Sequence, residues 1–269
     1  FITRKEWDKI VQSGDCEKAK GKIVLTFDDA TSCHFDYIFP ELEKRGLWGF
    51  FYIPSAPYLQ KKLLDVHIVH LLCGKFDGRE LLASLLSIIE DEMIILSERR
   101  RFTSYAYMNQ QNYEGVTEFK KTINYFISPL FRRPILDTLL KFYSISITAD
   151  DFYMKISDLK QISRSQSILG AHTINHPVMS KLSAREQMNE IRGSFDFLSE
   201  ISTLDYRTYC HPYGGEHSFN ADTMKSLALE NVSFSFSVEP RQIKKNDFKE
   251  NRHRLPRFDC NQFRFGRAR

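Results

Sequence analysis

The chain has 269 residues, of which 42% are hydrophobic and 13% aromatic, so it can bury a full core and form one large α/β domain. Its 38 Lys and Arg against 34 Asp and Glu give a formal net charge of +4, which argues against a dedicated nucleic-acid surface. Five scattered cysteines without CxxC spacing argue against a disulfide framework, and no apolar run is long enough for a membrane span. With no signal peptide in the sequence, we expect a cytoplasmic protein.

The first two predicted strands enclose a short helix. Residues 22–27 (KIVLTF) form an apolar run that ends in two aspartates, and residues 48–53 (WGFFYI) form the next run. Between them, residues 39–45 have the length of a helix, and Gly46 supplies a stop signal. This order predicts a βαβ unit and a parallel β/α architecture.

Residues 60–155 interrupt the pattern. They contain amphipathic helical runs and no convincing strand; the runs are 80–96, 117–127 and 134–143. Pro129 and Pro134 are predicted to separate helices, because proline suits the first helical position. We interpret 60–155 as a large helical insertion, and we expect it to cover the mouth of the barrel on the side of Asp28 and His172.

The β/α pattern returns after residue 155. Residues 156–162 are helical in pattern, and residues 167–171 (SILGA) predict a strand that runs into His172. A helix begins at Ser183, where a capping box with Glu186 precedes apolar residues spaced by three and four positions. The further predicted elements are a strand at 206–209, a helix at 222–229 and a strand at 232–238.

These elements divide the chain into a first part of the barrel (1–59), the helical insertion (60–155) and a second part of the barrel (156–269). The second part ends in a basic segment, because residues 241–269 contain ten Lys and Arg. We interpret this segment as a solvated tail. The alternative is attraction of an anionic substrate carrier, such as a nucleotide diphosphate or a lipid phosphate.

Three short motifs stand where predicted strands end: TFDD at 26–29, HTINHP at 172–177 and HPYGG at 211–215. Strand ends of a parallel β/α barrel meet at one face, so the motifs can surround one substrate. His172 and His176 share a face if their segment forms a helical turn, and Asp29 would complete a three-ligand metal site. This set suits Zn²⁺, with other first-row divalent ions left open.

A catalytic metal site keeps a position for water, and that water needs a base. The adjacent Asp28 is placed to be the base while Asp29 binds the ion. The alternative for the two aspartates is a turn or helix cap. His67 and His70 also have a helical i, i+3 spacing, but we interpret them as ordinary helix residues.

TFDD, then H-[ST]-x-x-H-P, then a Pro-Tyr-Gly turn resembles the polysaccharide deacetylase (NodB-homology) family. The similarity covers roughly residues 20–55 and 150–260 and leaves out the insertion. It implies a distorted (β/α) barrel that hydrolyses an acetamide, with the base and metal ligands assigned above. It also implies that the backbone N–H of Tyr213 helps to form the oxyanion hole, and that the turn Pro212-Tyr213-Gly214 contacts the substrate.

The sequence departs from the family pattern in two places. Many members carry an arginine at the position of Cys210, and some carry a late Leu-x-His whose histidine is the general acid; this chain has neither. The proton donor is therefore open, with His211 and His253 as candidates. An ordinary turn remains the alternative for the HPYGG motif.

Arg257, in the segment LPRFD, lies where a final barrel strand is expected. We hypothesise that it replaces the missing arginine by holding the Asp28 carboxylate in a bidentate contact, with Arg254 and Arg252 as fallback candidates. The alternative is a surface arginine in a basic tail.

The leading functional hypothesis is a metal-dependent hydrolase that removes an acetyl group from an N-acetylated sugar. The sugar would be nucleotide-linked or lipid-linked, in surface polysaccharide or glycoconjugate biosynthesis. The alternatives are an amide hydrolase of a small nitrogenous metabolite and a carbohydrate-binding pseudoenzyme.

Overall fold

The computed structural model describes residues 1–104, 106–107, 112–264 and 266. The chain forms two compact units: unit 1 comprises Phe1–Lys61 and Ala149–Arg269, and unit 2 comprises Lys62–Thr148. Among the described residues, every helix is too short or too polar to cross a bilayer.

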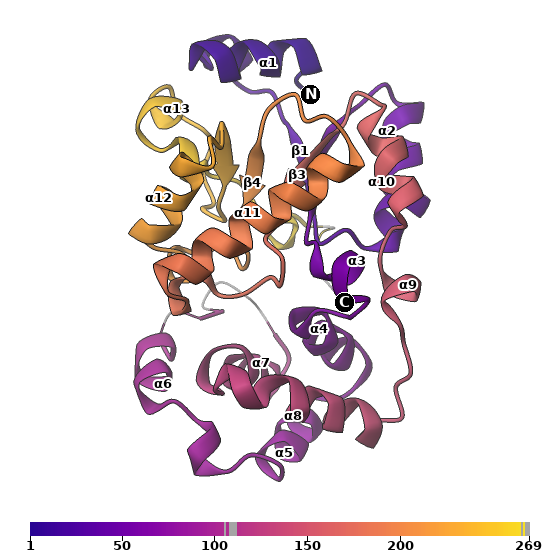
Figure 1. The fold of residues 1–269 in the computed structure, drawn as a ribbon, viewed down its shortest axis with the longest axis vertical. Helices are drawn as coiled ribbons and strands as arrows, with labels where there is room; N and C mark the ends of the chain where they lie inside the picture. The colour runs from indigo at the N-terminus through magenta and orange to yellow at the C-terminus, as the bar shows by residue number, and fades with distance from the viewer. Residues whose placement is uncertain (105, 108–111, 265, 267–269) are drawn as a thin grey trace. The chain divides into compact units, whose positions relative to one another are not determined.

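Unit 1 is built on a parallel sheet of five strands in the order β1-β2-β3-β4-β5 (Figure 1). The strands are β1 (Leu25–Asp28), β2 (Gly49–Ile53), β3 (Ile168–Ala171), β4 (Thr208–Cys210) and β5 (Phe234–Phe236). Every residue of β2 and β3 is buried, because layers on both faces cover a parallel sheet. This is the parallel β/α architecture that the sequence predicts.

The helices of unit 1 connect these strands and cover the sheet. They are α1 (Arg4–Ser13), α2 (Phe39–Lys44), α3 (Ala56–Gln60), α9 (Ala149–Phe152), α10 (Ile156–Ser163), α11 (Ala184–Ile201), α12 (Ala221–Leu229) and α13 (Asp247–Glu250). The predicted capping box of α11 is present, since the Ser183 and Glu186 side chains each accept the other's backbone N–H.

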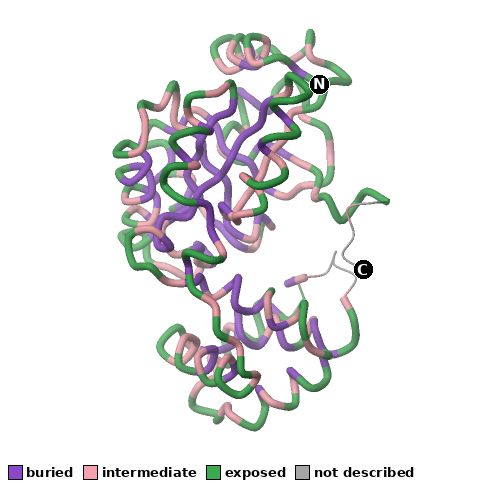
Figure 2. The backbone as a smooth tube through the Cα atoms, turned by 90° about the vertical axis from the view of Figure 1, so that its right-hand side faces the viewer, coloured by how far each residue is buried: buried purple, intermediate pink, exposed green. Residues whose placement is uncertain are grey.

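Successive residues of β2 enter two different cores. Phe51 and Ile53 pack with α2, α10 and α11, whereas Phe50 and Tyr52 pack on the other face with α1. Figure 2 shows the buried residues along the strands and on the inner sides of the surrounding helices. The sheet is therefore fixed from both faces.

Helix α1 supplies Trp7 to the second core. The Trp7 ring lies 5.5 Å from the Phe50 ring, 5.4 Å from Phe234 and 5.8 Å from Phe248, each in an edge-on arrangement. Aromatic pairs at these distances and angles add specific attraction to the gain from burial. The sequence analysis did not predict α1, although it joins both ends of the chain into one core.

Unit 2 is helical. Its elements are α4 (Asp65–Lys75), α5 (Gly78–Leu86), α6 (Leu96–Phe102), α7 (Val116–Lys121) followed by a π-helical turn (Thr122–Phe126), and α8 (Pro129–Phe142). The predicted run 80–96 ends early, because α5 ends at Leu86 and Asp91–Met93 forms a separate short 3₁₀ turn.

The predicted break at Pro134 is wrong. Helix α8 begins at Pro129 and continues through Pro134, which lies inside it. Proline lacks only its own N–H, so this helix loses the single bond that residue 134 would donate to Leu130. The side chain of Thr138 donates to the carbonyl of Pro134, one turn later.

The predicted last strand is reduced to one bridge. Leu255 pairs in parallel with Phe236, donates its N–H to Ser235 and accepts the N–H of Ser237. This bridge places the following residues beside the carboxyl end of the sheet. It therefore positions Arg257, two residues further along.

We predict that Gly170→Ala destabilises the protein by about 1–3 kcal/mol. An added Cβ would lie 2.4 Å from Cε1 of Tyr52, whose hydroxyl is held 2.8 Å from Thr208 Oγ1, so the ring must move. Urea unfolding measures the loss. Gly74→Ala is the control, because a Cβ there meets nothing within 4 Å; equal effects of both variants would contradict the close packing at Gly170.

Candidate metal centre and catalytic residues

Backbone pairing continues past the strand ends and brings the predicted residues together. The N–H of Asp29 donates to Tyr52, that of His172 to Ile53, and that of His211 to the carbonyl of Phe236. These hydrogen bonds fix the backbone of the first residue after each of the three strands. The carboxyl ends of β1, β3 and β4 meet at one face, as expected for a parallel β/α fold.

Asp29, His172 and His176 form the predicted three-ligand group. Oδ1 of Asp29 lies 3.4 Å from Nε2 of His172 and 3.5 Å from Nε2 of His176. A tetrahedral ion with bonds of about 2.1 Å separates neighbouring ligand atoms by about 3.4 Å. Two imidazoles and a carboxylate at these separations therefore fit a divalent ion such as Zn²⁺.

Left-handed backbone conformations aim the ligands at one another. Asp29 has φ 80° and Ala30 has φ 56°, so the chain turns directly after β1 and Asp29 leaves the strand geometry of Asp28. Thr173 and His176 have φ 66° and 53°, so the segment between the histidines is a turn with two left-handed residues. The two histidines therefore meet without the helical turn that the sequence analysis offered as one way to bring them together.

His172 is oriented by a second contact. Its Nδ1 lies 2.8 Å from the carbonyl oxygen of Cys210, so Nδ1 carries the proton in a neutral ring and Nε2 keeps its lone pair. Burial works against a positive charge here, but hydrogen bonds to Asp29 and Cys210, together with the nearby Asp28 carboxylate, raise the pKa of His172 well above its ordinary value. A bound cation would therefore replace a proton.

Arg257 holds Asp28 as hypothesised. Its Nη1 lies 2.9 Å from Oδ1 of Asp28 and 3.0 Å from Thr26 Oγ1, and its Nη2 contacts the other carboxylate oxygen. Burial opposes the charge of Asp28, but the guanidinium outweighs it and holds the pKa of the carboxyl below its ordinary value. The other two candidate arginines bind different groups: Arg254 donates to the side chain of Asn251, and Arg252 donates to the carbonyl of Phe248.

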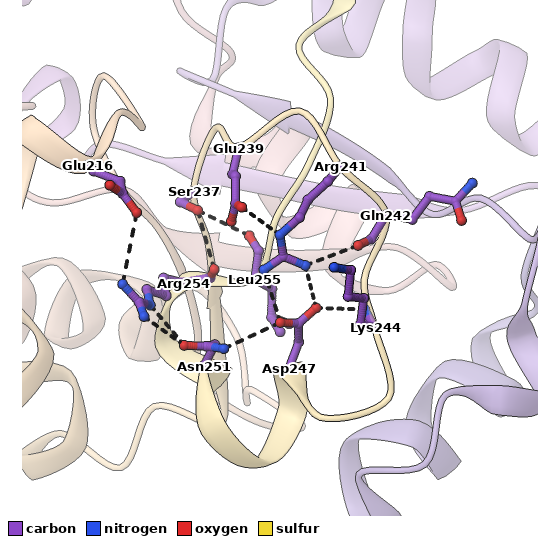
Figure 3. A network of polar contacts seen from close by, with 10 residues as sticks. All are labelled: Glu216, Ser237, Glu239, Arg241, Gln242, Lys244, Asp247, Asn251, Arg254 and Leu255. Carbon is purple, nitrogen blue, oxygen red and sulfur yellow. Dashed lines mark hydrogen bonds and ion pairs between the residues drawn. The ribbon is translucent and has the colours of Figure 1, made fainter. Parts of the chain in front are cut away.

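An ionic network fixes the loop that precedes Arg257 (Figure 3). Arg241 donates to both oxygens of the buried Asp247 at 2.7 and 3.0 Å, and Asp247 also accepts from Asn251. Asn251 in turn accepts both Nε and Nη2 of Arg254. This part of the basic C-terminal segment is folded, which corrects its interpretation as a solvated tail.

Cys210 lies inside the site. Its Sγ is 3.4 Å from Oδ2 of Asp28, and burial raises the pKa of the thiol. Asp28, His172 and Cys210 also meet the spacing of a metal group. Arg257 contacts both oxygens of Asp28, so the group of Asp29 is the better candidate for a metal site. Among the described residues, no metal group includes His67 or His70.

His211 is a structural residue in this arrangement. Its Nε2 lies 2.8 Å from the carbonyl oxygen of His253, and its ring stacks on Phe219 at 4.0 Å. Burial lowers the pKa of His211 to about 3, so the ring is neutral and its N–H is held by a carbonyl. We therefore remove His211 from the catalytic groups. Nε2 of His253 lies 2.8 Å from the carbonyl oxygen of Val232, so His253 is not a catalytic group either.

The turn after β4 lies beside the metal ligands. The Tyr213 ring is 5.0 Å from the His176 ring. Tyr213 and Gly214 have φ 62° and 70°, and a Cβ at Gly214 would lie 2.3 Å from Val238 Cγ2, so only glycine fits there. The roles of Pro212 and Gly214 in substrate contact, and of the Tyr213 N–H in the oxyanion hole, stay predictions.

Sequence reasoning missed two residues that support the site. Thr26 and Asp28 both accept a hydrogen bond from Nη1 of Arg257. The two residues are spaced i, i+2 on one strand, so their side chains lie on the same face, and this spacing could have indicated a shared partner. Glu190 of α11 bonds the backbone between the two histidines. Only the fold brings Glu190 there, so no local signal marks it.

Residues 140–232 match the sequence model of the family described as polysaccharide deacetylase. The resemblance to the polysaccharide deacetylase family is confirmed. The match contains His172 and His176 and the turn after β4, whereas Asp28, Asp29 and Arg257 lie outside it. No curated protein sequence matches the chain.

Two solved deacetylases share the fold. Streptococcus pyogenes deacetylase PplD in complex with acetate is 13% identical with a TM-score of 0.54, over 96% of this chain and 72% of that chain. A de-N-acetylase from Aggregatibacter actinomycetemcomitans is 12% identical with a TM-score of 0.50, over 96% and 76% of the two chains. The predicted distorted (β/α) barrel of the NodB-homology type is thereby confirmed.

We predict that His172→Ala and His176→Ala each lose the metal, whereas Asp28→Asn retains it. Two ligands rarely hold a catalytic ion against buffer, but Asp28 is committed to Arg257 and contributes no ligand. Metal content after dialysis, measured by mass spectrometry, tests both statements. Stoichiometric metal in the double histidine variant, or equal losses in Asp28→Asn and Asp29→Asn, would refute the assignment.

We predict that Arg257→Lys lowers kcat by roughly tenfold or more and leaves the metal content unchanged. A single ammonium group cannot hold both oxygens of Asp28 and the hydroxyl of Thr26. Steady-state kinetics of the metal-loaded protein provide the measurement. Arg254→Lys is the matched control, and a kcat equal to wild type in Arg257→Lys would remove the positioning role.

Proposed function

We propose that the protein is a metal-dependent hydrolase that removes the acetyl group from an N-acetylated sugar. The observation that carries the proposal is that two adjacent carboxylates, Asp28 and Asp29, have different partners. Asp29 faces two imidazoles at the spacing of a metal site, and Asp28 is held ionised by Arg257 beside them. A metal ligand next to an ionised carboxylate that does not bind the metal is the arrangement that amide hydrolysis by water requires.

Asp29, His172 and His176 would hold the ion. When bound there, a divalent cation would polarise the acetyl carbonyl and lower the pKa of a water molecule. Asp28 then accepts the proton of the attacking water, because its pKa lies below the ordinary range and it is unprotonated near neutral pH. Arg257 fixes the carboxylate rotamer throughout.

The leaving amine needs a proton, and Asp28 is the group that can supply it. Having taken a proton in the first step, the same carboxyl can return it to the nitrogen when the C–N bond breaks. His211 is neutral and buried, so it does not compete for this role. One carboxyl thus serves as base and then as acid.

We further propose that the substrate is a nucleotide-linked or lipid-linked sugar in cytoplasmic glycoconjugate or surface polysaccharide assembly. All five cysteines are free thiols, which suits a reducing compartment. A role of unit 2 in covering the site and choosing the sugar stays a prediction.

Acetate release tests the function. We expect the zinc-loaded protein to release acetate from at least one of three classes: N-acetylglucosamine oligomers, nucleotide-linked N-acetyl sugars and lipid-linked N-acetyl sugars. Asp28→Asn should reduce kcat by roughly 10² or more while binding the same metal.

The outcomes separate the candidate functions. Binding of these sugars without acetate release would indicate a carbohydrate-binding pseudoenzyme. Hydrolysis of small amides or cyclic amides, with none of the three sugar classes cleaved, would indicate the alternative enzyme.

A further inference from the structure

The segment that joins the two histidine ligands is strained. Thr173 and His176 both adopt left-handed backbone conformations without being glycine. Such conformations cost of order 1 kcal/mol or more each and persist where surrounding structure holds them. The orientation of His176 relative to His172 therefore depends on what holds the peptides between them.

Glu190 of helix α11 bonds those peptides directly. Its Oε2 accepts the backbone N–H groups of Ile174 and Asn175, both at 2.8 Å, and its Oε1 accepts the side-chain amide of Asn175 at 2.6 Å. A carboxylate only accepts, so the Asn175 nitrogen must be the atom that faces it. One carboxylate thus takes three hydrogen bonds from two consecutive residues, and charge strengthens each bond.

A second observation places the same loop on the same helix. Gly193 lies three residues after Glu190, and a Cβ there would lie 2.6 Å from Cδ1 of Ile174. On its other side the loop accepts backbone N–H groups, from Ser55 to Thr173 and from Ala56 to Ile174. The loop is therefore fitted between α11 and the segment after β2.

We propose that Glu190 is a positioning residue of the metal centre, which sets metal affinity by holding the backbone between His172 and His176. The inference rests on the proposed function only in requiring that these histidines bind a metal. Residues that orient metal ligands change metal affinity by about 10- to 100-fold when they are removed. Glu190 acts on the backbone of the ligand loop, so the same scale applies.

Reversing the polarity of the Glu190–Asn175 contact tests the proposal. Asn175→Asp sets two carboxylates against each other, and we expect it to weaken Zn²⁺ binding by about 10- to 100-fold. The double variant Glu190→Gln with Asn175→Asp restores a donor facing an acceptor and should recover most of the affinity. Glu190→Gln alone should have a small effect, because the Asn175 amide can turn over.

The measurement is the Kd for Zn²⁺, by competition with a chromophoric chelator, on the full chain. Thermal unfolding of the metal-free proteins checks that each variant folds, and Glu200→Gln, at an exposed position of the same helix, is the matched control. If Asn175→Asp does not fold, Glu190→Ala takes its place, with the same loss of affinity expected.

Three results would overturn the inference. Asn175→Asp could bind Zn²⁺ as tightly as wild type or more tightly, which would show that the Glu190–Asn175 contact does not set the affinity. The double variant could stay as weak as Asn175→Asp, or Glu190→Ala could bind like wild type. A wild-type chain that binds no Zn²⁺ would instead overturn the proposed function, and with it the metal site itself.

Discussion

The structure depends on one constraint, the parallel alignment of short strands whose carboxyl ends meet at a single face. Residues 28, 172 and 211 are far apart in the sequence, yet each follows or ends a strand of the same sheet. The backbone pairing continues one residue past β1, β3 and β4, so the chain is rigid where the reactive groups begin. Rigid elements place side chains more accurately than loops do.

Two neighbouring aspartates receive different partners because the chain changes conformation between them. Asp28 is the last residue of β1, and Asp29 follows with φ 80°. One carboxylate therefore points to a guanidinium and the other to two imidazoles. Electrostatics then keeps the roles apart, since the guanidinium favours ionisation of Asp28 while the imidazoles engage Asp29.

The sequence predicts well what local pattern controls. Apolar runs locate β1, β2 and β3, an alternating pattern locates β5, the Ser183 capping box locates α11, and motifs that follow strands locate the candidate metal ligands. It predicts poorly what depends on contacts between distant segments. The segment from His172 to His176 is a strained loop rather than the helical turn that would also bring the histidines together, because hydrogen bonds with α11 and with the segment after β2 hold its backbone.

His211 shows the same limit from the other side. The sequence leaves His211 as a candidate proton donor, yet burial against Phe219 and a hydrogen bond to the carbonyl of His253 determine its chemistry. Arg257 is the reverse case. The order of the motifs along the chain predicts Arg257 on a last strand. A single bridge at Leu255 replaces that strand and still places the guanidinium of Arg257 against Asp28.

The interleaving of early and late segments also bears on how the chain acquires its structure. Trp7 packs against Phe234 and Phe248, and Asp28 binds Arg257, so both of these early residues have partners more than 200 positions later. Unit 2 lies between the two halves of unit 1 in sequence and forms a compact unit of its own. During synthesis unit 2 can therefore fold before unit 1 is complete. Until the later strands are made, β1 and β2 keep apolar surface exposed. A nascent chain released before residue 257 would lack the guanidinium that holds the Asp28 carboxylate, so the candidate site would be complete only with the last residues of the barrel.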